Sequence, residues 1–268
     1  MAKLGWVLLS VAVFYLVAVA AVAMFQHRLL YLPERIAAGT ALPVGLKHWP
    51  NRSDFRGYVA EPRGAGRATV LVLHGNAGHA VHRAHYAATL VPLGLRVVLA
   101  EYPGYGERRG LVGEPSLVPD AEQAIALAHG LHGAPVLVLG VSLGAGVAAR
   151  AAAAQSERVA GLLLVTPWSR LADVASHHYP WLPVRWLLRD RYDSAAHLED
   201  FARPVLTVVA EHDAVIPAAH GLALHEGLRG AKRLALLAGS GHTDWPERLD
   251  SRWWQEAIDF LLSTPEIS

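Results

Sequence analysis

The stretch LGVSLGAGVAA at residues 139–149 decides the fold, because two different motifs fit it. Residues 140–144 read Gly-x-Ser-x-Gly, the pattern of a nucleophile elbow, in which a serine stands on a sharp turn between a strand and a helix. Residues 144–149 read Gly-x-Gly-x-x-Ala, the pattern of a dinucleotide-binding turn. The two patterns share Gly144, so the rest of the chain must distinguish them.

Short apolar runs alternate with helix-like stretches along most of the chain. The strand-like runs are residues 55–61, 68–75, 95–102, 135–142, 159–166, 204–211 and 232–239. The helix-like stretches are residues 79–91, 117–131, 143–155, 217–228 and 246–262. This alternation predicts an α/β fold with a mostly parallel sheet and helices on both faces. The first run alternates polar and apolar residues, so we expect it to be an antiparallel strand.

The dinucleotide pattern lacks the partners it needs. Its glycine turn should follow the first strand of the fold, and an acidic residue should lie about 20 residues further on. Here the turn follows a later strand, and the next strand ends in Thr166-Pro167 without an acid. Glu157, the nearest acid before that strand, lies in a helix-to-strand connection. We therefore expect Gly146 and Ala149 only to let a helix pack closely on the sheet.

The elbow finds its partners in the expected order. A serine nucleophile on this kind of turn needs an acid and then a histidine later in the chain. Asp213 follows the run 204–211, and His242 follows the run 232–239. Since ligand sites form at the carboxyl ends of parallel strands, both side chains should lie near Ser142. We predict Ser142 as nucleophile, His242 as general base and Asp213 as the acid that orients it.

An oxyanion hole is the fourth requirement of this chemistry. One donor should be the backbone N–H after the nucleophile, here that of Leu143, and the other should come from a loop after an earlier strand. The loop HGNAG at residues 74–78 follows the run 68–75, and we predict that Asn76 supplies the second N–H. We expect His74 to brace that loop.

The N-terminus has the features of a membrane segment. The 22 residues from Leu4 to Phe25 carry no charge, and as a helix they would extend about 33 Å, enough to cross a bilayer core. A cleaved signal peptide is the alternative, since Ala21-Val22-Ala23 resembles a cleavage site, but the apolar run is long for one. We expect a single-pass signal anchor. The flanking charges do not determine its orientation, and the short tail before residue 4 favours a catalytic domain outside the cytoplasm.

These features divide the chain into an anchor (residues 1–28), a loop-rich connector (29–54) and a hydrolase domain (55–268). Residues 167–200 exceed a normal crossover between strands, and long inserts of this kind often serve as lids or binding loops. We predict a lid-like insert that caps the site, with a helical excursion packed on the domain as the alternative. The insert holds three tryptophans, Trp168, Trp181 and Trp186.

Composition excludes several other classes of function. The net charge is +1 and no basic stripe is present, so we expect no nucleic-acid partner. Without cysteine, the chain has no disulfide, thiol nucleophile or cysteine-bound metal. His79, His82 and His85 are spaced by three, which allows a metal site, but no carboxylate accompanies them in sequence. We favour a polar helix face, and expect neither metal nor cofactor.

Several motifs give the chain a family resemblance. They are HGNAG (74–78), EYPGYGERRG (101–110), GVSLGAG (140–146), DAVIP (213–217) and GSGHTD (239–244). Over residues 55–262 the chain resembles the α/β-hydrolase superfamily, and within it a branch of membrane-anchored proteins similar to the serine aminopeptidase group and to protein depalmitoylases. FQHRLLYLP at residues 25–33 fits the same branch. The resemblance implies the same triad and oxyanion hole. One departure is Glu101-Tyr102-Pro103, where the branch more often has Asp-Tyr-Arg.

The expected activity is hydrolysis of a carboxylic ester or thioester through an acyl-enzyme. An anchor near the site and a tryptophan-rich insert favour a small-molecule or lipid-like acyl substrate. A peptidase or amidase of the same fold is the first alternative. A non-catalytic, membrane-anchored binding module is the second, and the complete set of triad residues argues against it.

Overall fold

The centre of the protein is a sheet of eight strands, in the order β10-β9-β8-β7-β4-β6-β3-β2. The computed structural model describes residues 2–37, 39–133 and 135–263. All neighbours from β10 to β6 run parallel, while β3 lies antiparallel to β6 and β2 antiparallel to β3. The predicted α/β fold with a mostly parallel sheet is confirmed, including the antiparallel first run, which forms β3.

The strands and helices have the following bounds. The strands are β1 Leu32–Pro33, β2 Lys47–Trp49, β3 Gly57–Ala60, β4 Ala68–Leu73, β5 Ala77–Gly78, β6 Leu95–Ala100, β7 Val136–Val141, β8 Val159–Val165, β9 Val205–Ala210 and β10 Lys232–Leu237. The α-helices are α1 Ala2–Leu30, α2 Ala84–Leu90, α3 Glu114–His132, α4 Leu143–Ala154, α5 Leu171–His178, α6 Val184–Leu187, α7 Ser194–Leu198, α8 Ala218–Gly227 and α9 Ser251–Leu262. Short 3-10 helices are η1 Ala80–Arg83, η2 Val91–Leu93 and η3 Trp245–Arg248.

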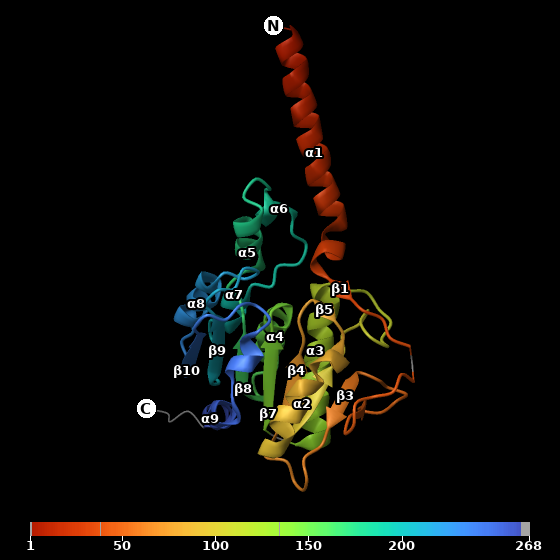
Figure 1. Cartoon of the computed structure of the whole chain (residues 1–268), viewed down its shortest axis with the longest axis vertical. Helices are drawn as coiled ribbons and strands as arrows, with labels where there is room; N and C mark the ends of the chain where they lie inside the picture. Colours follow the sequence, from red (N-terminus) through yellow and green to blue (C-terminus); the bar gives the residue numbers. More distant parts are fainter. Residues whose placement is uncertain (1, 38, 134, 264–268) are drawn as a thin grey trace.

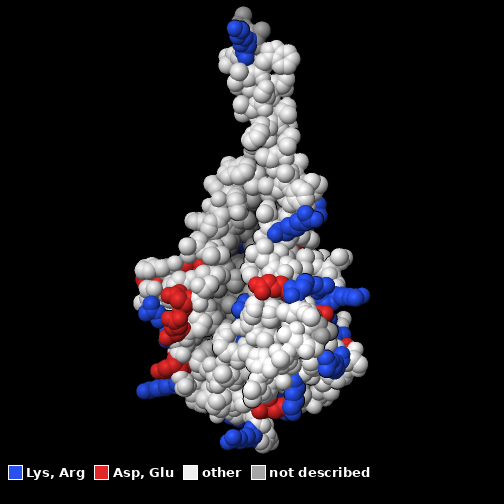
Figure 2. All heavy atoms as spheres, turned by 45° about the vertical axis from the view of Figure 1, so that its right-hand side comes forward, with Lys and Arg blue, Asp and Glu red and all other residues white. Residues whose placement is uncertain are grey.

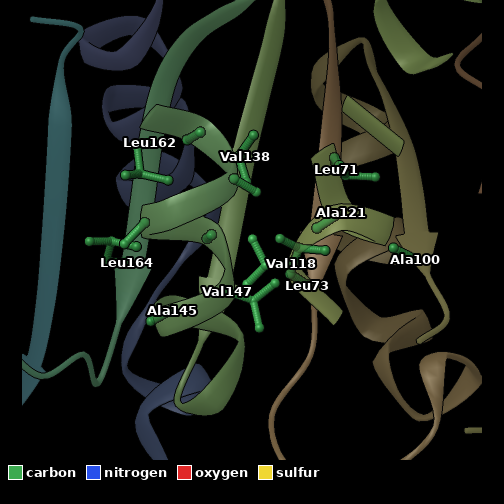
Figure 3. Close-up of a cluster of buried hydrophobic side chains, with 14 of the residues drawn as sticks. Leu71, Leu73, Ala100, Val118, Ala121, Val138, Ala145, Val147, Leu162 and Leu164 are labelled. Carbon is green, nitrogen blue, oxygen red and sulfur yellow. The ribbon is translucent and has the colours of Figure 1, made fainter. Parts of the chain in front are cut away.

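Helices cover both faces of the sheet, because successive side chains of a strand point to opposite faces. In β4, Leu71 and Leu73 belong to the core beneath α3 and α4, whereas Val70 and Val72 belong to the core beneath α2 and α9. Figure 3 shows the first of these cores, in which side chains of α3 and α4 meet those of β4, β7 and β8. The central strands are therefore apolar on both sides.

Helix α4 is built almost entirely from alanine and glycine, and nearly all of it is buried. Small side chains let its first turn approach the end of β4 so closely that a Cβ on Gly144 would overlap the carbonyl oxygens of Leu73 and His74. Gly146 has a different role from the one we expected. A Cβ there would lie 3.1 Å from side-chain atoms of both Trp168 and Tyr192, so Gly146 makes room for the insert rather than for the sheet.

The segment we interpreted as a loop-rich connector contributes to both sheets. Residues 47–49 form β2, the edge strand of the main sheet, and residues 32–33 form β1, which pairs with β5 in a separate two-stranded sheet. The sheet of the hydrolase domain therefore begins before residue 55. Strands of two or three residues are too short to show an alternating pattern, which is why they could not be recognised from the sequence.

Helix α1 projects from the domain as a long shaft (Figure 1). Residues Lys3–Leu30 have a mean hydropathy of 2.7 over their most apolar window, and their length and composition make them a candidate transmembrane span. Figure 2 shows the shaft free of acidic and basic side chains between a basic group near its tip and others at its base.

The insert of residues 167–200 folds into three short helices, α5, α6 and α7. Helices α5 and α6 rise from the domain on the same side as α1 (Figure 1). Trp168 is buried and its indole N–H donates to the Tyr192 carbonyl at 3.1 Å, whereas Trp181 and Trp186 are exposed. The tryptophans of the insert therefore have two separate roles, one inside the domain and one at its surface.

The approach of α4 to β4 predicts opposite effects for two glycine-to-alanine substitutions. Gly144→Ala forces a methyl group against two backbone carbonyls and should destabilise the protein by about 1–3 kcal/mol. Gly130→Ala, inside α3 and with no atom within 4 Å of the added carbon, should stabilise it by about 0.5–1 kcal/mol. Urea unfolding of both full-length variants measures the difference, and equal stabilities would contradict the close approach.

Candidate functional site

Ser142 stands between β7 and α4 in a strained backbone conformation. Its φ of 54° and ψ of −118° are unusual for a residue with a side chain. Gly140, two residues before Ser142, lets α4 pack against the end of β7. A Cβ at this position would lie 2.7 Å from the Ala145 Cα and 2.6 Å from the Ala148 Cβ. Strain of this kind persists only where surrounding packing enforces it, and it is common at active sites.

The structure brings Ser142, His242 and Asp213 together from three loops. The Ser142 hydroxyl lies 3.1 Å from Nε2 of His242, and Nδ1 of His242 lies 2.7 Å from Oδ2 of Asp213. The His242 side chain is partly exposed, while the Asp213 carboxylate is almost completely buried. The arrangement forms a continuous hydrogen-bonded chain from carboxylate to hydroxyl.

Backbone groups hold the acid and the histidine in place. The second carboxylate oxygen of Asp213 accepts hydrogen bonds from the N–H groups of Val215 and Ile216, at 2.8 and 2.7 Å. The loop that carries His242 is closed by Asp244, which accepts a hydrogen bond of 2.6 Å from the Gly241 N–H. Sequence reasoning missed this role of Asp244, although Asp is common in turns because its side chain accepts hydrogen bonds from nearby backbone N–H groups.

Asn76 lies in the loop between β4 and β5 and is held by its side chain and carbonyl. Its Nδ2 donates to the Leu30 carbonyl at 3.1 Å, and its own carbonyl accepts from the Leu32 N–H at 2.9 Å and the Tyr105 hydroxyl at 2.8 Å. None of the described residues accepts a hydrogen bond from the backbone N–H of Asn76 or Leu143. Both N–H groups are therefore available to a ligand beside Ser142.

A buried polar cluster supports the same loop from below. His74 lies with Nδ1 2.8 Å from the Gly75 carbonyl and Nε2 3.2 Å from the Glu101 carboxylate, and Tyr102 donates to the His74 carbonyl at 3.0 Å. Glu101 also accepts from the Ala80 N–H. The expected bracing position of His74 is thus observed, and its partner is Glu101, at which the chain departs from the branch it resembles.

The last turn of α1 and the residue after it also reach the site. Leu30 contacts Asn76, and the Tyr31 hydroxyl donates to Asp190 at 2.6 Å and lies 2.9 Å from the Tyr192 hydroxyl. Burial raises the pKa of Tyr31, with further contributions from Tyr192 and Asp190, so its hydroxyl keeps its proton. Sequence reasoning missed these contacts because they join segments that lie far apart in the chain.

Two cavities meet at Ser142 and Asn76. The first, of about 380 Å³, is an apolar groove between α5, the Asp213 loop and the end of α1. Its described lining includes Leu30, Leu143, Trp168, Leu171, Val174, Tyr179, Val215 and Ile216. The second, of about 230 Å³, lies on the other side of Ser142 and is bordered by Arg83, His85, Tyr86, His242 and Trp245. A ligand bound across Ser142 would extend into both.

The three evenly spaced histidines do not share one helix face. His79 precedes η1, His82 lies within it, and His85 belongs to α2, where its ring stacks 4.3 Å from that of Tyr86. Glu34, distant in sequence, joins His79 and His82 so that one ligand atom from each lies within 4.8 Å of the others. Burial, and then the neighbouring His82, lower the pKa of His79. The absence of a bound metal stays a prediction from the sequence.

Comparison with known proteins identifies the family. Residues 64–193 match the family model described as serine aminopeptidase, S33. The uncharacterized protein Rv2307c of Mycobacterium tuberculosis is 36% identical over 248 residues, covering 89% of this chain and 87% of that protein. The chain belongs to the α/β-hydrolase superfamily of serine hydrolases and is related to its ABHD branch.

A lipase is among the sequence relatives, and another lipase is among the structures with the same fold. The lysophosphatidylserine lipase ABHD12 of Danio rerio is 27% identical over 78% of this chain, and the match spans 60% of that protein. Among solved structures, Est1E of Butyrivibrio proteoclasticus with bound ferulic acid superimposes with a TM-score of 0.66 at 16% identity, covering 78% of this chain and 96% of that one. A monoacylglycerol lipase of Paleococcus ferrophilus gives 0.58 at 20% identity, covering 78% and 99%. These structures share the fold.

Proposed function

We propose that this protein is a membrane-anchored serine hydrolase that cleaves a carboxylic ester or thioester with a lipid-like acyl chain. The observation that carries the proposal is the hydrogen-bonded chain from Asp213 through His242 to Ser142, placed where an apolar groove meets two free backbone N–H groups. The lysophosphatidylserine lipase among the relatives and the monoacylglycerol lipase among the similar structures support the same class of reaction.

In this mechanism His242 removes the proton from the Ser142 hydroxyl as its oxygen attacks the acyl carbon. Asp213 orients the imidazole through Nδ1 and stabilises the imidazolium that forms. His242 then gives the proton to the leaving alcohol or thiol, and an acyl group stays bonded to Ser142. Water attacks this acyl-enzyme while His242 takes a proton from it, and His242 then returns that proton to the Ser142 oxygen as the bond to the acyl group breaks and the carboxylic acid leaves.

The negative charge that develops on the acyl oxygen is stabilised by the backbone N–H groups of Asn76 and Leu143. Donors aimed in advance at this oxygen lower the barrier because they need no reorganisation when the charge appears. Each such donor contributes about 2.7–4 kcal/mol to transition-state stabilisation. The Tyr105 hydroxyl supports this arrangement indirectly, since it holds the Asn76 carbonyl and thereby the orientation of the loop.

The two cavities support an acyl chain on one side of Ser142 and a polar alcohol portion on the other. Apolar side chains from α5 and the Asp213 loop dominate the groove of about 380 Å³. Arg83 borders the smaller cavity and is the one Lys or Arg among its described lining residues. A polar or anionic headgroup next to the scissile ester matches that cation.

An aminopeptidase is the alternative that the family model's description favours. An aminopeptidase must bind a free ammonium group, and a carboxylate normally supplies that contact. Among the described residues that line the two cavities, none is Asp or Glu. The cavities therefore favour an ester over a peptide, and a purely binding role would leave the triad geometry without a purpose.

Helix α1 anchors the enzyme in this proposal, as a single-pass segment that is not cleaved. The orientation favoured by the sequence, with the hydrolase domain outside the cytoplasm, belongs to the same proposal. Residues near the end of α1 support the uncleaved form, because Leu30 lines the groove and the buried Gln26 is hydrogen-bonded to the insert. Loss of the anchor would remove part of the site.

Ser142→Ala should abolish covalent labelling by a fluorophosphonate probe, since the reactive oxygen is gone. The control is Ser176→Ala, which removes a hydroxyl of α5 that donates to the Ala172 carbonyl. Labelling of both full-length variants is measured by in-gel fluorescence. A Ser142→Ala protein that still labels would disprove the nucleophile.

Two aspartates near His242 should differ sharply in their effect on the rate. Asp213→Asn leaves the wrong imidazole tautomer and should lower kcat by about 10⁴-fold. Asp244→Asn keeps an oxygen that can accept from the Gly241 N–H, so its kcat should fall by about tenfold or less. Steady-state kinetics with a nitrophenyl ester gives both values, and similar losses would show that the acid is wrongly assigned.

Substrate class follows from the groove. Among nitrophenyl esters of graded length, kcat/KM should rise from acetyl to medium and long acyl chains, because each buried CH₂ contributes about 0.8 kcal/mol. Matched thioesters should be hydrolysed, and aminoacyl amides should be poor substrates. A sharp optimum at acetyl, or a preference for the amides, would refute the acyl groove.

A further inference from the structure

We infer that α1 and the tip of the insert form one unit embedded in the bilayer, so that the acyl groove opens into a lipid leaflet rather than into water. The insert tip is defined here as residues 179–188. The lipid substrate in this inference rests on the proposed function, whereas the position of the tip in the bilayer follows from its contacts with α1 and does not depend on catalysis. The surface it assigns is a binding surface for a phospholipid bilayer.

The insert tip is bonded to α1 at two levels. Near the base of the helix, the Gln26 amide donates to the Leu187 carbonyl at 3.1 Å and accepts from the Arg189 N–H at 2.8 Å. Higher on the shaft, the Tyr15 hydroxyl donates to the Trp181 carbonyl at 2.9 Å. The tip therefore runs alongside the second half of α1, as Figure 1 also shows.

One face of α1 is partly covered at the same levels. The partly covered or buried positions from the middle of the helix to its end are Ala18, Val19, Ala21, Val22, Ala23, Gln26, His27 and Leu30, while the opposite side is exposed. Positions three or four residues apart share one helix face. This is the pattern of a helix that packs against a neighbour on one side and meets solvent or lipid on the other.

Helix length then places the tip inside the bilayer. A hydrocarbon core of about 30 Å needs about 20 helical residues. If the bilayer began beyond Trp181, only Lys3–Phe14 would be left to cross it, about 12 residues or 18 Å. That is too short, so a spanning α1 carries Trp181 into the hydrocarbon region, about 22 Å along the helix from Leu30.

The surface of the tip suits this environment. Its aromatic side chains are exposed, with Trp186 at 86%, Trp181 at 55% and Tyr179 at 51%. Tryptophan and tyrosine rings present large apolar surfaces, and their single polar group is compatible with a position towards the membrane–water interface. Arg185 is the single charged residue of α6. Its guanidinium pairs at 2.9 Å with Asp173, which lies near the start of α5 and outside the tip. A long side chain of this kind can place its charge near the headgroups.

The acyl groove is lined in part by residues of α1 and of the insert tip. Leu30 belongs to the last turn of α1, Tyr179 belongs to the tip, and Val215, which is 52% exposed, belongs to the Asp213 loop. All three line the groove that begins at Ser142. A lipid with one acyl chain can thus move from the leaflet into the groove while its ester reaches Ser142 at headgroup level.

Spin labelling tests the position of the tip, and the chain has no native cysteine to interfere. Trp186→Cys and the control Leu131→Cys are made in the full-length chain, labelled with a nitroxide and reconstituted in phosphatidylcholine vesicles. Leu131 is 53% exposed at the end of α3, which leads into the start of β7 and so lies at the edge opposite Ser142. Collision rates with oxygen and with a water-soluble nickel complex are measured.

The label at position 186 should collide mainly with oxygen, which concentrates in lipid, and the label at position 131 mainly with nickel. Nickel access at 186 equal to that at 131 would overturn the inference. Shielding of 186 from both reagents would overturn it as well, because it would indicate a protein neighbour such as a second copy.

Activity separates this inference from the proposed function. Trp186→Glu should lower hydrolysis of a long-chain ester carried in vesicles by about tenfold or more, since a charge resists insertion, and leave kcat/KM for a soluble short-chain ester unchanged. Leu131→Glu should change neither. Equal losses on both substrates would reject the bilayer route, whereas failure of the proposed function would appear as short-chain hydrolysis that survives Ser142→Ala.

Discussion

The site depends on how closely the first turn of α4 approaches the end of β4. Gly144 faces the carbonyl oxygens of Leu73 and His74 with no room for a side chain. This approach sets Ser142 beside the loop that follows β4, and Asn76, Ser142 and Leu143 line the same groove. The strained φ of Ser142 is maintained because the helix behind it is almost entirely buried.

The loop after β4 is in turn held from several directions. Tyr105 and the N–H of Leu32 both donate to the Asn76 carbonyl, while the Asn76 side chain donates to the carbonyl of Leu30. Two of these three contacts come from the segment that leaves α1. Orientation of the loop is therefore coupled to the end of the helix, and β1, which pairs with β5, extends the same connection.

The sequence predicted what repeats or occurs in a fixed order. Six apolar runs and one alternating run indicated the seven longer strands. The order serine, aspartate, histidine at strand ends indicated the residues that the structure brings together at Ser142. Contacts between distant segments have no such signature. Glu34 beside His82, or Tyr31 beside Asp190, depends on how the chain folds back. Gly146 was assigned to the wrong neighbour for the same reason, since a small residue indicates close packing without naming the partner.

Gln26 connects these points in physical terms. A polar amide near the end of a membrane-spanning helix would be costly if it faced lipid unpaired. In the structure both its donor and its acceptor are used, by the carbonyl of Leu187 and the N–H of Arg189. A flexible tether would need no such residue. The pairing instead fixes α1 against the insert, so in the proposed membrane arrangement the distance between Ser142 and the lipid surface would be set by hydrogen bonds of the folded domain.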